Sequence, residues 1–150
     1  MPALPRTDLL SAISDAIHES GFSGGLITSP LKKLPARFAV VSQNGNEFIL
    51  TVYAWTLTHG GGAARPTHEY RIQMTSVESP LQVDSTGVTI LIGYEPELQV
   101  FAGFDLRRHR TFTTGSPSIQ IDIRTVRQAL QDGLAFSRKS NDEIAVGIRS

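Results

Sequence analysis

Short runs in which apolar and polar residues alternate constrain the fold of this 150-residue chain more than any other feature. In the segment 118–123, Ile119, Ile121 and Ile123 alternate with polar residues, and the segment 70–75 has the same period. A period of two places apolar side chains on one face of a β-strand and polar side chains on the other. The sequence therefore predicts a sheet with one dry face, whose polar face is turned to solvent or to a ligand.

Two hairpins are predicted where turn residues separate β-branched and aromatic runs. In the first hairpin, Asn44-Gly45 tolerates the positive φ that a tight turn needs. In the second, Pro96 presets the backbone for a turn between two acidic residues. The four strands are expected at residues 38–42, 48–55, 88–94 and 98–106.

Two helices are predicted, one near each end of the chain. Apolar residues at helical spacing indicate a helix over 7–20, with Thr7 capping its start and Gly21 ending it. Asp122 is expected to cap a second helix that Gly133 stops. The buried face of that second helix is expected to consist of Val126, Ala129 and Leu130.

The last strand is predicted over 143–149, with Ile144, Val146 and Ile148 facing inward. Residues 21–35, which are rich in Gly, Ser and Pro, are expected to form an ordered loop. About seven strands with a helix near each end suggest an α+β fold whose strand-rich sheet curls into a barrel or pseudobarrel. Residues 1–150 are expected to form a single domain, since no internal repeat interrupts them.

Composition and charge limit the classes of function. The chain has 14 basic and 14 acidic residues, and a net charge of zero argues against a protein that coats DNA indiscriminately. It has no cysteine, which excludes a disulfide framework and fits the reducing cytoplasm. No apolar run approaches the roughly 20 residues of a membrane helix, and residues 1–10 lack the core of a secretory signal. We therefore expect a cytoplasmic protein without a membrane partner.

No catalytic motif of the chain is complete. His59 and the glycines 60–62 look like the oxyanion loop of lipases and esterases, but residues 115–118 lack the nucleophile elbow that this chemistry needs. No P-loop lysine follows these glycines, and the four histidines do not have the spacing of a helical zinc site. The sequence thus predicts a binding module, with no enzymatic activity, no cofactor and no metal.

The densest basic cluster comes directly after a predicted strand and comprises Arg107, Arg108, His109 and Arg110. Guanidinium groups placed in this way can hold phosphates, which points to a polyanion partner. A charged loop that pairs with Asp105 and Glu95 explains the same cluster equally well. Both interpretations stay open.

Polar side chains on two alternating strands form a second candidate site. Arg71 and Gln73 come from one strand, and Ser118 and Gln120 come from another. If the two strands are neighbours, these side chains can read base edges or bind a small polar ligand. A solvated sheet face is the alternative.

Aromatic residues in the strands are candidates for stacking on bases, above all Trp55, which ends a predicted strand beside the glycines, and Tyr70. Most aromatic residues in strands pack in a core, and this is the competing interpretation.

Several stretches carry a resemblance to a known family: VYAWTLTHGG at 52–61, EYRIQMT at 69–75, GFD at 103–105 with RH at 108–109, SPSIQ at 116–120, and NDEIAV at 141–146. Together they resemble the amino-terminal module of bacterial HNH-family endonucleases of restriction type. The resemblance covers roughly residue 34 to the end and leaves the first helix and the following loop, residues 1–35, outside it.

In the proteins that this chain resembles, the module precedes a separate HNH nuclease domain, which holds a metal and cuts DNA. The resemblance therefore implies the sensing part of such an endonuclease, which recognises modified or foreign DNA, with base flipping as an analogy from other modification readers. Two alternatives remain open, namely a small-ligand or nucleotide sensor that regulates the nuclease, and a module that forms a homodimer.

Overall fold

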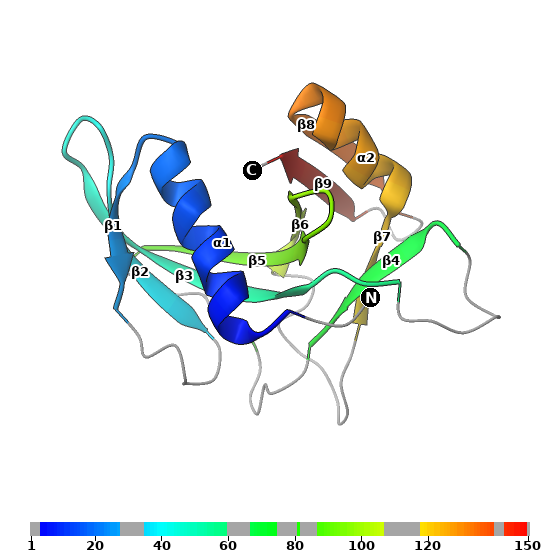
Figure 1. The fold of residues 1–150 in the computed structure, drawn as a ribbon, viewed down its shortest axis with the longest axis horizontal. Helices are drawn as coiled ribbons and strands as arrows, with labels where there is room; N and C mark the ends of the chain where they lie inside the picture. Colours follow the sequence, from blue (N-terminus) through cyan, green and yellow to red (C-terminus); the bar gives the residue numbers. More distant parts are fainter. Residues whose placement is uncertain are drawn as a thin grey trace.

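A mixed sheet of seven strands forms the larger part of the fold in the computed structural model (Figure 1). The structure describes residues 4–27, 35–59, 67–74, 81, 87–106, 118–139 and 143–149. All neighbouring strands of this sheet are antiparallel except β3 and β5, which are parallel. In spatial order the strands are β1 (Ser23–Leu26), β2 (Ala36–Val41), β3 (Glu47–Thr56), β5 (Gly87–Glu95), β6 (Val100–Phe104), β9 (Ile144–Arg149) and β8 (Leu134–Arg138).

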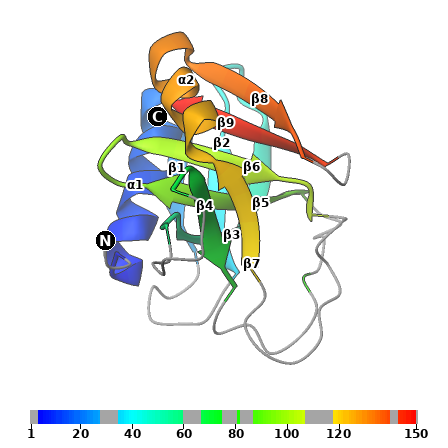
Figure 2. The ribbon, with the colours of Figure 1, turned by 90° about the vertical axis from the view of Figure 1, so that its right-hand side faces the viewer.

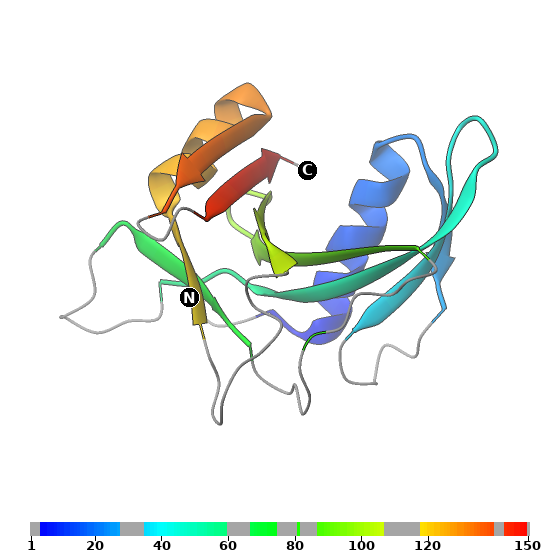
Figure 3. The same ribbon diagram turned by 180° about the vertical axis from the view of Figure 1, so that it is seen from behind.

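A separate antiparallel ribbon consists of β4 (Glu69–Gln73) and β7 (Ser118–Asp122). Figure 2 shows these two strands running at a steep angle to β5 and β6. The helices α1 (Arg6–Glu19) and α2 (Ile123–Asp132) lie toward opposite ends of the main sheet (Figure 3). Strands dominate and helices are few among the described residues, so the predicted α+β class is confirmed.

The centre of the main sheet is covered on both faces. Along β3, Val52 and Ala54 belong to the apolar cluster beneath α1, whereas Tyr53 and Trp55 belong to the cluster beneath the β4–β7 ribbon and α2. Strand β5 alternates in the same way. Because both faces are dry, the second half of each strand is buried without interruption, which is typical of a strand between two layers.

Both predicted hairpins are confirmed. The turn between β2 and β3 has Gly45 at φ +87°, and the Gly45 amide donates to the Ser42 carbonyl at 3.0 Å. In the turn between β5 and β6, a carboxylate oxygen of Glu95 accepts the Leu98 amide at 2.6 Å. The strands that flank these turns agree with the predicted ones to within a few residues.

Both helices form where the apolar spacing predicts them, but the cap of the first one is different. Thr7 does not cap α1, because the helix begins at Arg6 and Pro5 occupies the capping position without a side-chain bond. Asp122 caps α2 as predicted, accepting the Arg124 amide at 2.9 Å, and Gly133 ends that helix at φ +85°. Of the predicted inner face of α2, Val126 and Ala129 are buried, but Leu130 is exposed.

The predicted orientation of the last strand is wrong. Ile144 and Ile148 are 48% and 40% exposed, whereas Ala145 and Gly147 are buried beneath α2. Small residues allow this helix to approach the strand closely, since a Cβ atom added at Gly147 would lie 2.9 Å from the Ala129 Cβ. The apolar pattern predicted the strand correctly. The face with Ala145 and Gly147 is the buried one, because only small residues allow α2 to pack so closely.

Two strands and the sheet closure also differ from the prediction. Strand β1 lies within the segment expected to be a loop, and β8 was not predicted at all. The main sheet is open, since β1 and β8 are its two edges and do not pair with each other. The curled sheet therefore does not close into a barrel.

We expect Gly147→Ala to lower the free energy of unfolding by about 1–3 kcal/mol, because the new methyl group must push α2 away from β9. Gly103→Ala is the matched control, since a Cβ atom there meets its nearest neighbour at 3.8 Å. Urea denaturation of both variants measures the difference. Equal stability of the two variants would contradict the close packing described above.

Candidate functional site

The structure brings the four polar residues of the alternating strands together on one face of the β4–β7 ribbon. Arg71 lies directly opposite Gln120, and Gln73 lies directly opposite Ser118. Gln73 is exposed and the other three are partly exposed. The predicted neighbourhood of these residues is therefore present as two adjacent cross-strand pairs.

The opposite face of the ribbon fixes its position on the main sheet. Ile72 and Ile119 form a cross-strand pair that is almost completely buried. Ile72 lies directly on Gly93 of β5, where an added Cβ atom would be only 2.5 Å from the Ile72 Cγ2. Because a glycine is present, the ribbon can approach β5 closely enough to exclude water from this contact.

The backbone of Thr58 extends the ribbon on its other side. The Thr58 amide donates to the Arg71 carbonyl at 2.9 Å, and the Arg71 amide donates to the Thr58 carbonyl at 2.7 Å. The main chain of Arg71 is thus held between Thr58 and Gln120, which places the three side chains in one row.

Hydrogen bonding on this polar face is incomplete. The Gln120 Nε2 donates to the Ser118 Oγ at 3.0 Å, which orients the amide along the strand. The Nε of Arg71 is buried and has no hydrogen-bond partner in the part of the chain that the structure describes. A buried guanidinium donor without an acceptor is unusual in proteins.

Neither candidate stacking residue shares the polar face of the ribbon. Trp55 is only 9% exposed and belongs to the core between the ribbon and the sheet. Tyr70 neighbours Arg71 in β4 and therefore points to the opposite side, where its ring meets the His59 ring edge-on at 5.8 Å. The structure does not bring either ring beside Arg71 and Gln120.

The basic cluster lies outside the described residues, as do the glycines 60–62. Its suggested ionic partners have other contacts. Glu95 is buried in the β5–β6 turn, and burial raises the pKa of its carboxyl group. Asp105 is half-buried, and its amide donates to a buried carboxylate oxygen of Glu143 at 3.3 Å.

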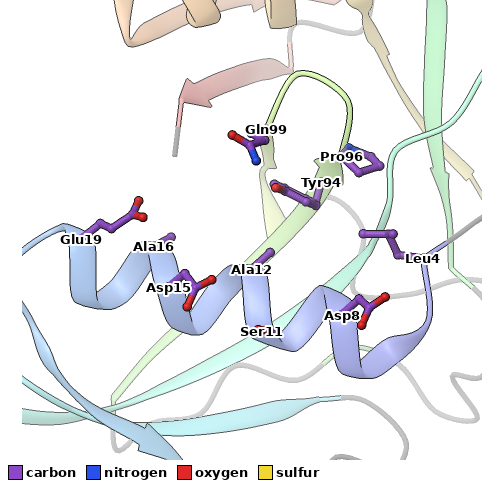
Figure 4. A pocket seen from close by; sticks show the side chains of 10 residues that line it. All are labelled: Leu4, Asp8, Ser11, Ala12, Asp15, Ala16, Glu19, Tyr94, Pro96 and Gln99. Carbon is purple, nitrogen blue, oxygen red and sulfur yellow. The ribbon is translucent and has the colours of Figure 1, made fainter.

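Sequence reasoning missed a groove between α1 and the β5–β6 turn, shown in Figure 4. Its volume is about 430 Å³, and carboxylates from Asp8, Asp15 and Glu19 line one wall. Acidic residues at positions i, i+7 and i+11 of a helix share a face, and this spacing was the available signal. Nothing local in the sequence shows that Tyr94 and Gln99 form the facing wall.

An apolar surface was also missed, because the last strand was expected to face the other way. On the face of the sheet that α1 covers elsewhere, the neighbouring strands β9 and β8 present paired apolar side chains, several of which are exposed. Phe136 is 64% exposed. The exposed members of this surface are Val88, Leu134, Phe136, Ile144 and Ile148.

The described residues contain no cluster of three or more side chains suited to a metal ion. Neither described helix is long and apolar enough to cross a membrane. The described helices and strands form an α+β fold with an open mixed sheet and a separate two-stranded ribbon.

The chain belongs to the family described as methylase-associated X1, whose model matches residues 48–150. This description indicates a role related to restriction and modification. The matched segment contains the ribbon and most of the region that carries the resemblance noted above. No curated protein and no solved structure matches the chain.

Asp122 ends β7 and caps α2, so its contribution to stability can be tested by substitution. The Arg124 side chain, hydrogen-bonded to Asp122, lowers the pKa of that carboxyl group from its ordinary value of 3.8. We expect Asp122→Ala to lower the free energy of unfolding at neutral pH by about 0.5–2 kcal/mol.

A lowered pKa in the folded state means that this stabilisation is complete above pH 3.8 and is lost as the pH falls through the folded value. The variant and the wild type should therefore converge in strongly acidic solution, as measured by urea denaturation over a pH series. Asp132→Ala, at the other end of α2, is the control and should show no such loss. A difference that persists unchanged at low pH would contradict the assignment.

Proposed function

We propose that this domain recognises DNA within a restriction–modification system and that the β4–β7 ribbon reads the bases. The observation that carries the proposal is the pair of cross-strand contacts, Arg71 with Gln120 and Gln73 with Ser118, on one accessible face. All four side chains are hydrogen-bonding groups, and arginine and glutamine are common partners of guanine and adenine edges.

The shape of the ribbon supports this proposal. The major groove of B-DNA is about 12 Å wide and admits a two-stranded antiparallel ribbon. Strands β4 and β7 form such a ribbon, with an apolar face fixed to the main sheet and a polar face directed away from it. An ordinary sheet face of seven strands could not enter the groove in this way.

The unpartnered Arg71 Nε supports a ligand on the same face. Leaving a buried donor unsatisfied costs about 1–3 kcal/mol, and more for a charged group. The Nε atom is closed to solvent, so a base acceptor would remove that cost only after the Arg71 side chain turns outward. Arginine suits a contact with two hydrogen bonds to one base edge better than lysine, because lysine lacks the planar fork of donors.

Phosphate contacts are assigned in this proposal to Arg107, Arg108, His109 and Arg110. They belong to the segment between β6 and β7 and so precede the proposed reading strand in the chain. Phosphate contacts fix the register of a protein on DNA, and base contacts then specify the sequence.

The attached enzyme is proposed to act on the same DNA. The family description points to a methylase, and the resemblance points to an HNH nuclease. Both enzymes act on DNA in restriction and modification. A domain that binds a modified or foreign duplex could therefore direct either enzyme to its substrate. In this proposal the domain itself is not an enzyme, uses no cofactor and works in the cytoplasm.

Mobility shifts with matched duplexes, unmodified, methylated or hydroxymethylated at cytosine, test the proposal. We expect Arg71→Ala to weaken binding to the preferred duplex by about 1–3 kcal/mol, or roughly 5- to 150-fold, and to relax the preference. Arg71→Lys should relax the preference while the dependence on salt is kept. Replacing Arg107 should instead weaken binding to all duplexes alike and reduce the slope of log K against log salt by about 0.9.

Arg127→Ala removes an exposed positive charge from α2 and serves as the control, with little expected change. The proposal is wrong if the purified chain binds none of the duplexes at low salt. It is also wrong if Arg71→Ala and Arg127→Ala weaken binding equally.

Homodimerisation is a second candidate function, which the edge strand β8 favours. Its unpaired edge borders the apolar surface, with Leu134 and Phe136 beside Ile148 and Val146 of β9. An edge strand pairs with its own copy about a two-fold axis and covers the adjoining apolar side chains in both subunits. No comparable observation favours a nucleotide sensor.

We expect the wild-type chain to form a dimer at micromolar concentration and Phe136→Glu to be monomeric, because a buried carboxylate opposes the interface. Leu130→Glu, on the exposed side of α2, is the matched control and should leave the dimer intact. Sedimentation velocity over a concentration series measures both. A monomeric wild type at high concentration would exclude this function.

A further inference from the structure

The groove between α1 and the β5–β6 turn combines negative charge with a hydroxyl group that no described residue bonds. Tyr94 is only 7% exposed, and its ring packs on Phe101 with a centroid distance of 4.7 Å. Figure 4 shows its hydroxyl group directed into the groove, with Gln99 beside it. Among the described residues no side chain or backbone group bonds this hydroxyl, so an acceptor is held by a rigid ring at the wall of the groove.

The facing wall carries three carboxylates that make no ion pair within the described part of the chain. Asp8, Asp15 and Glu19 lie along α1, about 10 Å and about 6 Å apart at the rise of an α-helix. Asp15 and Glu19 repel each other as like charges four residues apart. Glu19 also ends the helix, where the dipole disfavours a negative charge. The fold therefore keeps two mutually repelling charges, Asp15 and Glu19, on this wall.

Between the carboxylates the wall of the groove consists of small side chains, those of Ser11, Ala12 and Ala16. Leu4 and Pro96 close one end (Figure 4). These small side chains leave room for a narrow chain that joins separated positive charges. The volume of about 430 Å³ is within the range of small-molecule sites.

We propose that this groove binds a linear aliphatic polyamine. Its ammonium groups donate to the carboxylates of Asp15 and Glu19 and to the Tyr94 hydroxyl, and its methylene groups cover the alanines. Nucleic acid is repelled by the same carboxylates. A single metal ion would need oxygen ligands gathered around one point, whereas these carboxylates are spread along three turns of a helix.

The protonation state of Tyr94 agrees with an accepting role. Burial raises the pKa of its phenol, and the neighbouring carboxylates, Glu95 first and then Asp15 and Glu19, raise it further. The hydroxyl therefore stays neutral, and its oxygen accepts a hydrogen bond from an ammonium group, which can only donate.

Titration calorimetry of the full 150-residue chain with spermidine tests the proposal at roughly 0.15 M salt, where distant surface charges are screened. We expect one site per chain and weaker binding of the shorter diamine putrescine. Asp15→Asn and Glu19→Gln should each weaken spermidine binding about tenfold, since hydrogen bonds to charged groups are lost. Tyr94→Phe, which deletes only the hydroxyl, should weaken it several-fold.

Glu47→Gln is the charge-matched control, because this residue is exposed on β3, away from the groove, and should change binding by less than about twofold. Spermidine should also raise the melting temperature of the wild type but not of an Asp15→Asn, Glu19→Gln double variant. A cooperative melting transition of the double variant without spermidine shows that its loss of binding is not loss of folding. Absence of binding at millimolar spermidine would overturn the proposal. So would an equal loss in Glu47→Gln, or tighter binding of magnesium or of a trilysine peptide. No DNA is present, so the result is independent of the proposed DNA recognition.

Discussion

The rest of the structure depends on the parallel pairing of β3 with β5, because this pair is the part of the sheet that is dry on both faces. Every residue from Thr51 to Thr56 is buried, so the chain must supply one layer above the pair and another below it. Helix α1 provides the first layer, and the β4–β7 ribbon provides the second. The two candidate sites therefore lie on opposite sides of the sheet, one on each covering layer.

This separation explains why net charge is a poor guide to function here. The total is zero, yet the groove on α1 is lined by carboxylates that would repel a phosphate, and Arg71 lies on the ribbon across the sheet. A chain of this composition can therefore offer surfaces of opposite preference. The net charge of the whole chain does not reveal either surface. They become apparent only when the charged residues are assigned to α1 or to the β4–β7 ribbon.

Turns, caps and the alternation of polar and apolar residues could be predicted from the sequence, whereas the packing of one element against another could not. The turn at Asn44-Gly45, the Asp122 cap and the alternation that places Arg71 and Gln120 on polar faces all depend on neighbours in the chain. The orientation of β9 depends on how closely α2 can approach Gly147, which no pattern within the strand reveals. The groove needs α1 and a turn some eighty residues away to meet, and for that reason spacing within the helix predicted neither Tyr94 nor Gln99 as its other wall.

The contact of Ile72 with Gly93 has a mechanical consequence. There is no room for even one more carbon atom between them, so the ribbon cannot rock on the sheet without opening the core. A rigid mount of this kind sets a fixed angle between anything gripped by the ribbon and the axis of the main sheet. The polar face of the ribbon, with Arg71 and Gln120, is therefore presented in one fixed orientation relative to β5.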